Sequence, residues 1–538
     1  MKRPKLLSLQ QNGFILPTII SFIIAALIIT GAVLEIIDAN LSTVNTNVQS
    51  QMAFNIAEAG VNYYLWHLSH NSTDYYDGTG TCTGVSKYSP TPPGCGGYVH
   101  NYIDDNAVNE GTFTLYIQAQ GAGSTIVNVR SIGQVKGTNI IRTIQAQIGA
   151  ASFASYGVVS DSALWFGNTE SATGPVHSNQ GVRMDGPNSD VVTANNATYT
   201  PAYANGGCAG SNCSEPGVWC DPSVLSPNCN TRSKTDWIYP TATVDFGQVT
   251  SSLCTMKQIA TNNNAANACS QTPTVRTAGY LPQICTTGSG NSCSFSTTRG
   301  YLIELNPTGT YNLYTVNNEN DTLANYSAAL APQLVASNIT IPASGVIFAE
   351  DNVWVRSNPN FHGRVTIGAG RLAQANNNAN IVIADHLLYS TKNGSDAIGL
   401  VAEDSIYVAP YAPTAFPFEI DGALLAEAGS VTFGERGNLG SGQASYRSNP
   451  SACVQGWTNP NQVFNFYGSV ATRQTWTWTW LVNAHCGNAV FDPVNGWISG
   501  VENNNTQYDY NLLYSPPPSY PITSGYNIIS WREILTHP

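Results

Sequence analysis

The sequence predicts a mainly β protein with one long N-terminal α-helix, and three observations carry this expectation. The chain of 538 residues contains 48 Gly and 29 Pro, so turns divide its apolar residues into short segments, as in β-rich proteins. An uncharged apolar run from Phe14 to Leu34 continues into an amphipathic pattern. Further along, short apolar segments recur every 16 to 24 residues, roughly, which favours a right-handed parallel β-helix, with a β-sandwich as the alternative.

The charge balance excludes several classes of protein. Only 10% of the residues are charged, where an ordinary soluble domain has about a quarter, so neither a coiled-coil rod nor a charged disordered chain fits. The 21 Lys and Arg residues face 33 Asp and Glu residues, for a net charge of −12. Because no basic stripe is present to neutralise phosphates, nucleic acid is not an expected partner.

The N-terminal element is predicted to span a membrane. Lys2, Arg3 and Lys5 precede the apolar run, whose 21 residues are enough to cross a bilayer. Since basic flanks stay on the cytoplasmic side, everything after Glu35 is expected to be exported. A generic secretory signal would be shorter and would end in a small-x-small cleavage site. We therefore expect a single-pass protein of the cytoplasmic membrane with its body outside.

The helix is predicted to continue beyond the membrane as an amphipathic stretch. Its apolar positions follow steps of three or four residues and average about 3.6, the period of an α-helix. These positions are Ile37, Leu41, Val44, Val48, Met52, Ile56, Ala59, Tyr63 and Trp66. One helix over residues 14–68 follows, roughly 80 Å long.

A basic leader that ends in Gly13, followed by Phe14 and an apolar helix, resembles the class III signal of type IV pilins. The resemblance implies that a prepilin peptidase cuts between Gly13 and Phe14 and that the retained helix packs into a filament core. The segment from Ala53 to Leu68, with Ala-Glu-Ala-Gly at 57–60, is similar to the N-terminal region of PilX-type minor pilins. The implied partners are other pilin subunits, the prepilin peptidase, the pilus assembly machinery and the cytoplasmic membrane.

One position departs from the pilin pattern. The fifth residue after the implied cleavage site is Glu in most pilins, where it pairs with the terminal amine of a neighbouring subunit; here it is Thr18. A hydroxyl cannot neutralise a buried ammonium. Subunits that cap a filament are the ones expected to lack this acid, so the resemblance points to a tip subunit. The rival interpretation is a surface protein anchored by an uncleaved signal.

Strand-like alternation at 112–118, 125–135 and 139–148 predicts a small antiparallel sheet after the helix, which is the pilin pattern. The final segment, 510–533, resembles exported bacterial proteins that join a PilX-type N-terminus to a β-helical body. The expected organisation is a leader at 1–13, the helix at 14–68, a pilin-like sheet with a loop at 69–150, first β-helix coils at 151–199, a Cys-rich insertion at 200–334, further coils at 335–440 and a C-terminal cap with a disulfide loop at 441–538.

Acidic residues follow the small residue that ends four of the repeated segments. They are Glu350, Asp385, Glu403 and Glu427, placed in one coil position by aligning Ala349, Gly368, Ala384, Ala402 and Ala426. Stacked carboxylates repel unless they are solvated or bridged by a cation, so the row is either a Ca²⁺ or glycan site, a general acid/base pair, or a row of hydrated turn residues. Only His386 accompanies the row, which disfavours catalysis. His177, in another repeat turn, is expected at the surface.

All 12 cysteines follow residue 80 in loop-like surroundings, which indicates disulfides formed outside the cytoplasm. Neighbours in sequence are the expected partners among Cys82, Cys95, Cys208, Cys213, Cys220, Cys229, Cys254, Cys269, Cys285, Cys293, Cys453 and Cys486. A structural metal site would need Cys-x-x-Cys pairs or interleaved His, and neither occurs.

Alternating Trp476, Trp478 and Trp480 place three indoles on one face of a predicted strand. Core packing is the favoured interpretation, and a platform for sugar rings or another subunit is the alternative.

Two functional hypotheses follow. The first is a type IV pilus-associated minor pilin at the cell surface, with a structural or adhesive role towards a surface glycan or host-cell ligand and no resident cofactor. The second is a membrane-anchored, β-helical, carbohydrate-active enzyme; we expect no catalytic residues and favour the first.

Overall fold

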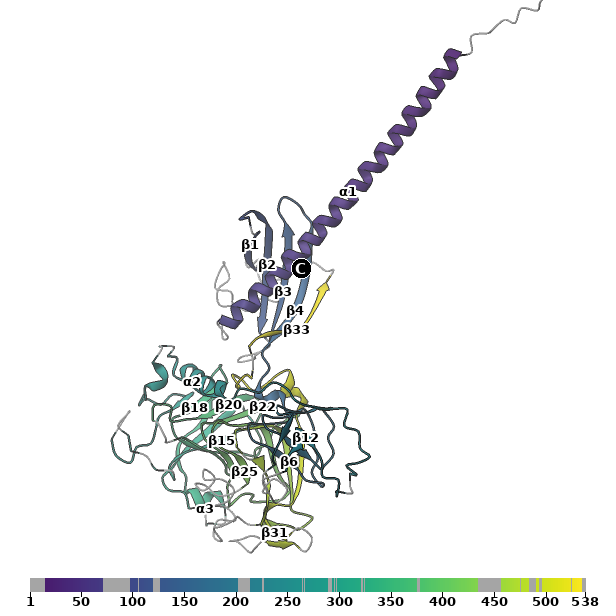
Figure 1. Ribbon diagram of the computed structural model, residues 1–538. Helices are drawn as coiled ribbons and strands as arrows, with labels where there is room; N and C mark the ends of the chain where they lie inside the picture. Colours follow the sequence, from purple (N-terminus) through teal and green to yellow (C-terminus); the bar gives the residue numbers. More distant parts are fainter. Residues whose placement is uncertain are drawn as a thin grey trace, which may run out of the picture. The chain divides into compact units, whose positions relative to one another are not determined.

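The computed structural model describes residues 15–70, 97–104, 106–119, 126–201, 213–224, 227–263, 265, 267–288, 293–294, 296, 298–320, 323, 325–374, 378–433, 456–474, 476–482, 490–492, 496–523 and 525–534 (Figure 1). The protein is mainly β with one long N-terminal helix, as the sequence predicts. It divides into two compact units. Unit 1 comprises residues 1–118, 128–147 and 528–538, and unit 2 comprises residues 119–127 and 148–527.

Unit 1 consists of a long helix and a sheet. The helix α1 spans Ile15–His70 without a break. The sheet has the strand order β1-β2-β3-β4-β33, and β1 pairs with β2 in antiparallel fashion. Its strands are β1 Tyr98–Ile103, β2 Asn109–Ala119, β3 Ile126–Val135, β4 Ile141–Gly149 and β33 Asn527–Ile534. Figure 1 shows β33, the last strand of the chain, beside β4.

The face of α1 that packs on the sheet differs from the predicted stripe. The buried residues are Ala53, Ile56, Ala57, Gly60, Val61, Tyr64 and Leu68, whereas Trp66 is 57% exposed. Three of these seven residues are Ala or Gly, because the backbones approach closely: a side chain at Gly133 of β3 would overlap the carbonyl oxygen of Ala53 and the amide nitrogen of Ala57. The spacing of the apolar residues therefore predicted the helix correctly. Of the buried residues of the helix, however, only Ile56 belongs to the predicted stripe.

Unit 2 is built from stacked, mostly parallel strands. The larger sheet has the order β13-β9-β7-β5-β27-β24-β22-β20-β18-β14, with β32 beside β27, and all these pairs are parallel. Its strands are β13 Trp237–Ile238, β9 Val192–Ala194, β7 Val176–Ser178, β5 Val158–Ser160, β27 Val463–Thr472, β24 Phe418–Ala426, β22 Ala397–Ala402, β20 Arg364–Ala369, β18 Val346–Ala349, β14 Tyr280–Leu281 and β32 Asn503–Tyr508.

A second sheet has the order β17-β16-β15-β19-β21-β23-β25-β28 and is parallel from β15 to β28. Its strands are β17 Gln333–Thr340, β16 Thr310–Val316, β15 Gly300–Leu305, β19 Asn352–Ser357, β21 Ile381–Ile383, β23 Ile406–Val408, β25 Val431–Phe433 and β28 Trp476–Thr477. Smaller sheets comprise β6 Leu164–Phe166, β8 Val182–Met184 and β12 Val218–Trp219; β10 Thr198–Tyr199 with β11 Glu215–Pro216; and β26 Gly456–Trp457, β29 Thr479–Val482, β30 Val490–Asp492 and β31 Gly496–Val501.

The chain alternates between the two main sheets from β18 to β28. Each strand of the larger sheet is followed by one of the second sheet, as β18 is by β19 and β20 by β21. The apolar residues that face inward from both sheets merge in one core, including Ile347, Trp354 and Ile383. Each pair of strands thus buries its apolar side chains only by stacking on the next pair.

The order in which strands stack in the larger sheet differs from their order in the chain. β5 lies beside β27, so the chain enters in the middle of the larger sheet. The segment expected as a cap, 441–538, contributes β27 to the middle of that sheet and β33 to unit 1. The expected insertion, 200–334, contributes β13 and β14 to the two ends of the same sheet.

The helix α2, Gly247–Thr261, covers part of the larger sheet. It packs on β14, β18 and β20, and its buried Val249, Leu253 and Met256 join a core cluster with Phe348 and Leu425. This helix lies in the segment between β13 and β14, the two end strands of the sheet. A second helix, α3, is short and spans Tyr326–Leu330.

Candidate functional site

The exposed half of α1 is the strongest candidate for a functional surface. Every residue from 15 to 48 is exposed, and the helix contains an apolar 18-residue window of mean hydropathy 2.6 with none of it buried. Leucine and isoleucine side chains at this density do not remain in water. The N-terminal part of α1 is therefore a candidate membrane anchor, as the sequence predicts.

The other half of α1 is fixed to its sheet in unit 1. Gly60 lies against Ser131 and Phe113, where a side chain would clash. The Arg142 guanidinium of β4 donates to the hydroxyl of Ser50 at 2.7 Å and forms an ion pair with Glu533 of β33. One continuous helix thus joins an apolar anchor to a folded unit.

Thr18 lies near the start of α1. Its hydroxyl donates to the carbonyl oxygen of Ile15 at 2.8 Å, one turn earlier in the same helix. A hydroxyl used in this way bonds within its own helix and carries no negative charge. The implied processing residues Gly13 and Phe14 lie outside the described residues.

The predicted row of carboxylates is not one row. Glu350, Glu403 and Glu427 directly follow β18, β22 and β24, which are strands of the larger sheet, whereas Asp385 follows β21 of the second sheet. The register also pairs Ala349 with Ala369, so Gly370 occupies the acidic position in the intervening strand. Placing Gly368 and Ala384 at the same coil position was wrong, because short apolar triplets do not show which of two sheets a strand belongs to.

Glu350 is buried in an ion pair. It is 1% exposed and contacts Lys257 of α2, which is fully buried. Lys257 also donates to the carbonyl oxygen of Cys269 at 3.0 Å. Burial raises the pKa of Glu350 to about 7, although the attraction of Lys257 opposes this. The pair fixes α2 to the end of β18.

The other three acids have partners within unit 2. Glu403 accepts hydrogen bonds from the backbone amides of Arg371 at 2.7 Å and Ala379 at 3.1 Å. Glu427 accepts from the hydroxyl of Thr250. Asp385 accepts from the hydroxyl of Thr414 at 2.6 Å. Burial raises the pKa of Glu403 and of Glu427.

These contacts engage the carboxylates that a Ca²⁺ site, a glycan site or an acid/base pair would use. The acids act as acceptors for turns and for α2, and among the described residues no group of three His, Cys, Asp or Glu is arranged to hold a metal ion. Glu350 does not fit the description of a hydrated turn residue, because it is only 1% exposed.

One of the two histidines differs from expectation. His177 was expected at the surface but is 3% exposed. Its Nδ1 lies 2.9 Å from the hydroxyl of Thr193 and its Nε2 3.0 Å from Oδ1 of Asn179. Burial lowers the pKa of His177. The Nδ1 of His386 accepts from the backbone amide of Glu419 at 3.2 Å, so it too has a structural contact.

The Trp476, Trp478 and Trp480 series does not form one exposed face. Trp476 is in β28 and Trp480 in β29, which belong to different sheets. Trp478 is 3% exposed, with its ring centroid 5.0 Å from that of Phe464 and 5.4 Å from that of Phe466. This geometry agrees with core packing.

Three cysteine pairs lie at disulfide distance, each between neighbours in sequence. They are Cys220 with Cys229, Cys254 with Cys269, and Cys285 with Cys293, whose Cα atoms are 5.8, 5.3 and 5.2 Å apart. Cys213 is also in a disulfide. Cys82, Cys95, Cys208, Cys453 and Cys486 lie outside the described residues.

The sequence analysis missed a charged cluster on β24 and β27. Lys392 contacts Glu419 and lies 3.0 Å from Asp421, with its ammonium 4.6 Å from the ring centre of Tyr467. Burial raises the pKa of Asp421 to about 7. The signal available in the sequence was Glu419 and Asp421 at alternate positions, which share one face of a strand.

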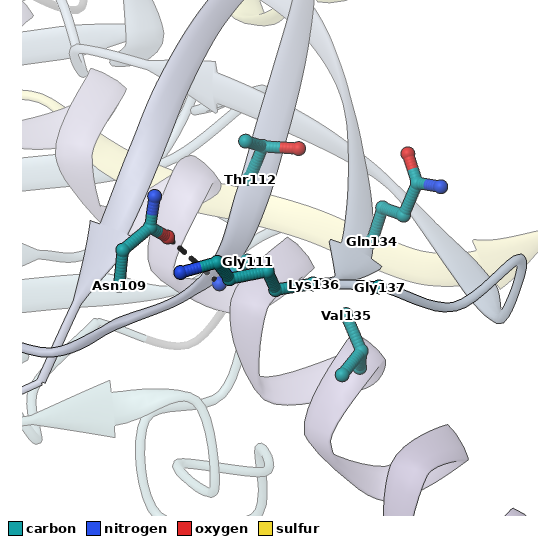
Figure 2. Close-up of a pocket in the computed structure, with 7 residues that line it drawn as sticks. All are labelled: Asn109, Gly111, Thr112, Gln134, Val135, Lys136 and Gly137. Carbon is teal, nitrogen blue, oxygen red and sulfur yellow. Dashed lines mark hydrogen bonds between the residues drawn. The ribbon is translucent and has the colours of Figure 1, made fainter.

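A small hollow lies at one end of the unit 1 sheet (Figure 2). Its volume is about 210 Å³, and Asn109, Gly111, Thr112, Gln134, Val135, Lys136 and Gly137 line it. The side chain of Asn109 accepts from the amide of Gly111 at 3.0 Å. The lining is a mixture of polar and apolar groups with Lys136 as its one charged side chain, and it does not point to a ligand class.

Comparison with known proteins gives little. No protein-family model matches the chain, and no curated protein does. Among solved structures, the competence-associated pilin ComZ from Thermus thermophilus is similar over 91% of this chain and 98% of its own, at 13% identity and a TM-score of 0.27. At that TM-score the similarity carries no argument about fold or activity.

Proposed function

We propose that this protein is a type IV pilus-associated minor pilin of the PilX type, which functions as a structural or adhesive subunit near a filament tip. The observation that carries the proposal is the construction of α1. Its exposed apolar half suits a membrane before assembly and a core of like helices afterwards, while its second half packs on a small sheet. The partners proposed are other pilin subunits, the prepilin peptidase and the assembly machinery.

The proposal assigns unit 2 to a right-handed parallel β-helix exposed to the surroundings. The parallel stacking of both main sheets and the alternation of the chain between them support this architecture. The disulfides among the described residues support assembly outside the cytoplasm. We assign no catalytic activity to the acids of the row, because each of the four is occupied by a partner within unit 2.

The test is processing at Gly13. Replacing Gly13 with Trp should leave an uncut precursor in the membrane, because a peptidase site that accepts glycine has no room for an indole; Asn12→Ala is the matched control. Mass spectrometry of the N-terminus in sheared surface filaments should find chains that begin at Phe14 for the wild type and the control only. Equal chain length and equal filament incorporation for Gly13→Trp would overturn the proposal.

A further inference from the structure

The last strand of the chain belongs to the first unit. β33 pairs with β4 at the edge of the sheet that carries α1, and nearly all of unit 2, the segment 148–527, separates these two strands in the chain (Figure 1). The sheet of unit 1 is consequently complete only when the C-terminus has arrived. This pairing joins strands that are far apart in the sequence.

β33 also contacts the helix through one arginine. The Arg142 Nη2 of β4 donates to Oε2 of Glu533 at 2.6 Å, and its Nη1 donates to Ser50 of α1 at 2.7 Å. The guanidinium lies 5.5 Å from the ring centre of Phe54, and the ring of Trp531 lies 6.1 Å from that same ring. The helix, β4 and β33 therefore meet at one charged and aromatic contact.

Removing β33 would take contacts away from β4, Arg142 and Phe54. The outer edge of β4 would lose its ladder of backbone hydrogen bonds, and open strand edges pair readily with other chains. Arg142 would lose the bidentate carboxylate that also raises its pKa, and Phe54 would lose the cover of Trp531. The part of α1 that unit 1 must hold would thus be loosened.

From this contact we propose that β33 is a closing strand, which makes unit 1 competent for assembly only after the whole of unit 2 has been exported. The order follows from the chain: α1 precedes the long segment of unit 2 and β33 follows it, so this segment is exported before β33. The link to filament assembly rests on the proposed function. The closing of the unit 1 sheet by β33 does not depend on that function.

The experiment compares two truncated chains in detergent. A chain that ends at Tyr526 lacks β33, and a chain that ends at Ile534 retains it and is the matched control. Hydrogen exchange is measured in β4 and in residues 49–70 of α1. We expect at least tenfold faster exchange in β4 for the shorter chain and recovery when a synthetic peptide of residues 525–535 is added. Equal exchange in the two chains would overturn the inference.

A point variant covers the case in which the shorter chain is degraded. Glu533→Ala removes the carboxylate from Arg142, and Ser530→Ala, at an exposed position of the same strand, is its control. We expect faster exchange at β4 and at Ser50 to Phe54 for Glu533→Ala alone. Equal exchange in both point variants would count against the closing strand.

A second readout separates the inference from the proposed function. Filaments are sheared from cells that express each chain, and the subunit is measured by mass spectrometry. Incorporation of the chain ending at Ile534 but not of the chain ending at Tyr526 supports both ideas. If the exchange difference is found and neither chain nor the wild type enters filaments, the closing strand stands and the pilin proposal fails. Incorporation of both chains equally would overturn assembly control.

Discussion

At the scale of residues, buried charge is the feature that most distinguishes unit 2. Lys257 and Glu350 are fully buried together between α2 and β18, and Arg371 and Asp351 form another such pair. Transfer of such groups from water is costly, so each charge depends on its partner. The Lys257 and Glu350 pair joins α2 to the end of β18.

Removing one partner of the Lys257 and Glu350 pair should destabilise unit 2 strongly. Lys257→Met leaves a buried carboxylate alone, and we expect a loss of about 3–5 kcal/mol in the free energy of unfolding. The double variant Lys257→Met/Glu350→Leu should recover most of it, because no charge stays buried. Urea unfolding with the disulfides intact measures both. Gln258→Met, at the next position of α2, is the control, and equal losses in single and double variants would contradict the role of charge.

His177 should make stability depend on pH. Its pKa is lowered by burial, so below the ordinary value of about 6.5 the unfolded chain binds a proton that the folded protein does not. Stability is fully present above that value and is lost as pH falls towards the lowered pKa, by up to about 1.4 kcal/mol per pH unit. Urea unfolding at pH 7.5 and 5.5 should show a smaller loss for His177→Gln. Parallel losses in both proteins would refute this origin.

At the scale of elements, α1 is held by a close backbone approach. Gly133 of β3 lies against the backbone at Ala53 and Ala57, and Gly60 lies against Ser131 and Phe113. Backbone atoms cannot rotate away as side chains can, so small residues are required here. This explains why the buried face of α1 is rich in Ala and Gly.

Gly133→Ala should therefore weaken the packing of α1. A methyl group there meets the backbone of Ala53 and Ala57, and we expect a loss of about 1–3 kcal/mol for unit 1. The control is Gly31→Ala in α1, where a methyl group meets nothing within 4 Å. Hydrogen exchange of residues 53–68 reports the effect. Unchanged exchange in Gly133→Ala would show that the helix shifts without cost.

At the scale of the whole molecule, the chain combines a unit made of one long helix and a small sheet with a much larger unit. Residues 148–527 leave unit 1 after β4 and return to it before β33. A subunit with an inserted body of this size would interfere with the close helical repeat of a filament shaft. Under the proposed function, Thr18 in place of an acid also indicates a tip position, because an unpaired terminal amine in an apolar filament core costs roughly several kcal/mol.

Labelling should accordingly mark filament ends. Antibodies against unit 2, detected with gold particles on sheared and on cell-attached filaments, are expected at low copy number at the tips. Thr18→Glu, which restores the acid of most pilins, should move some of the label into the shaft. Dense labelling along the shaft by the wild type would contradict a tip position.

The sequence alone determined what depends on neighbours along the chain. The period of about 3.6 residues and the length of the apolar run identified α1, and local spacing identified Cys220 with Cys229, Cys254 with Cys269, and Cys285 with Cys293. Only the tertiary structure decided which coils are neighbours, why Asp385 is separate from Glu350, and that β33 completes unit 1. Short apolar strands of similar composition can pair in many registers, and the choice among them is made by contacts between residues hundreds of positions apart.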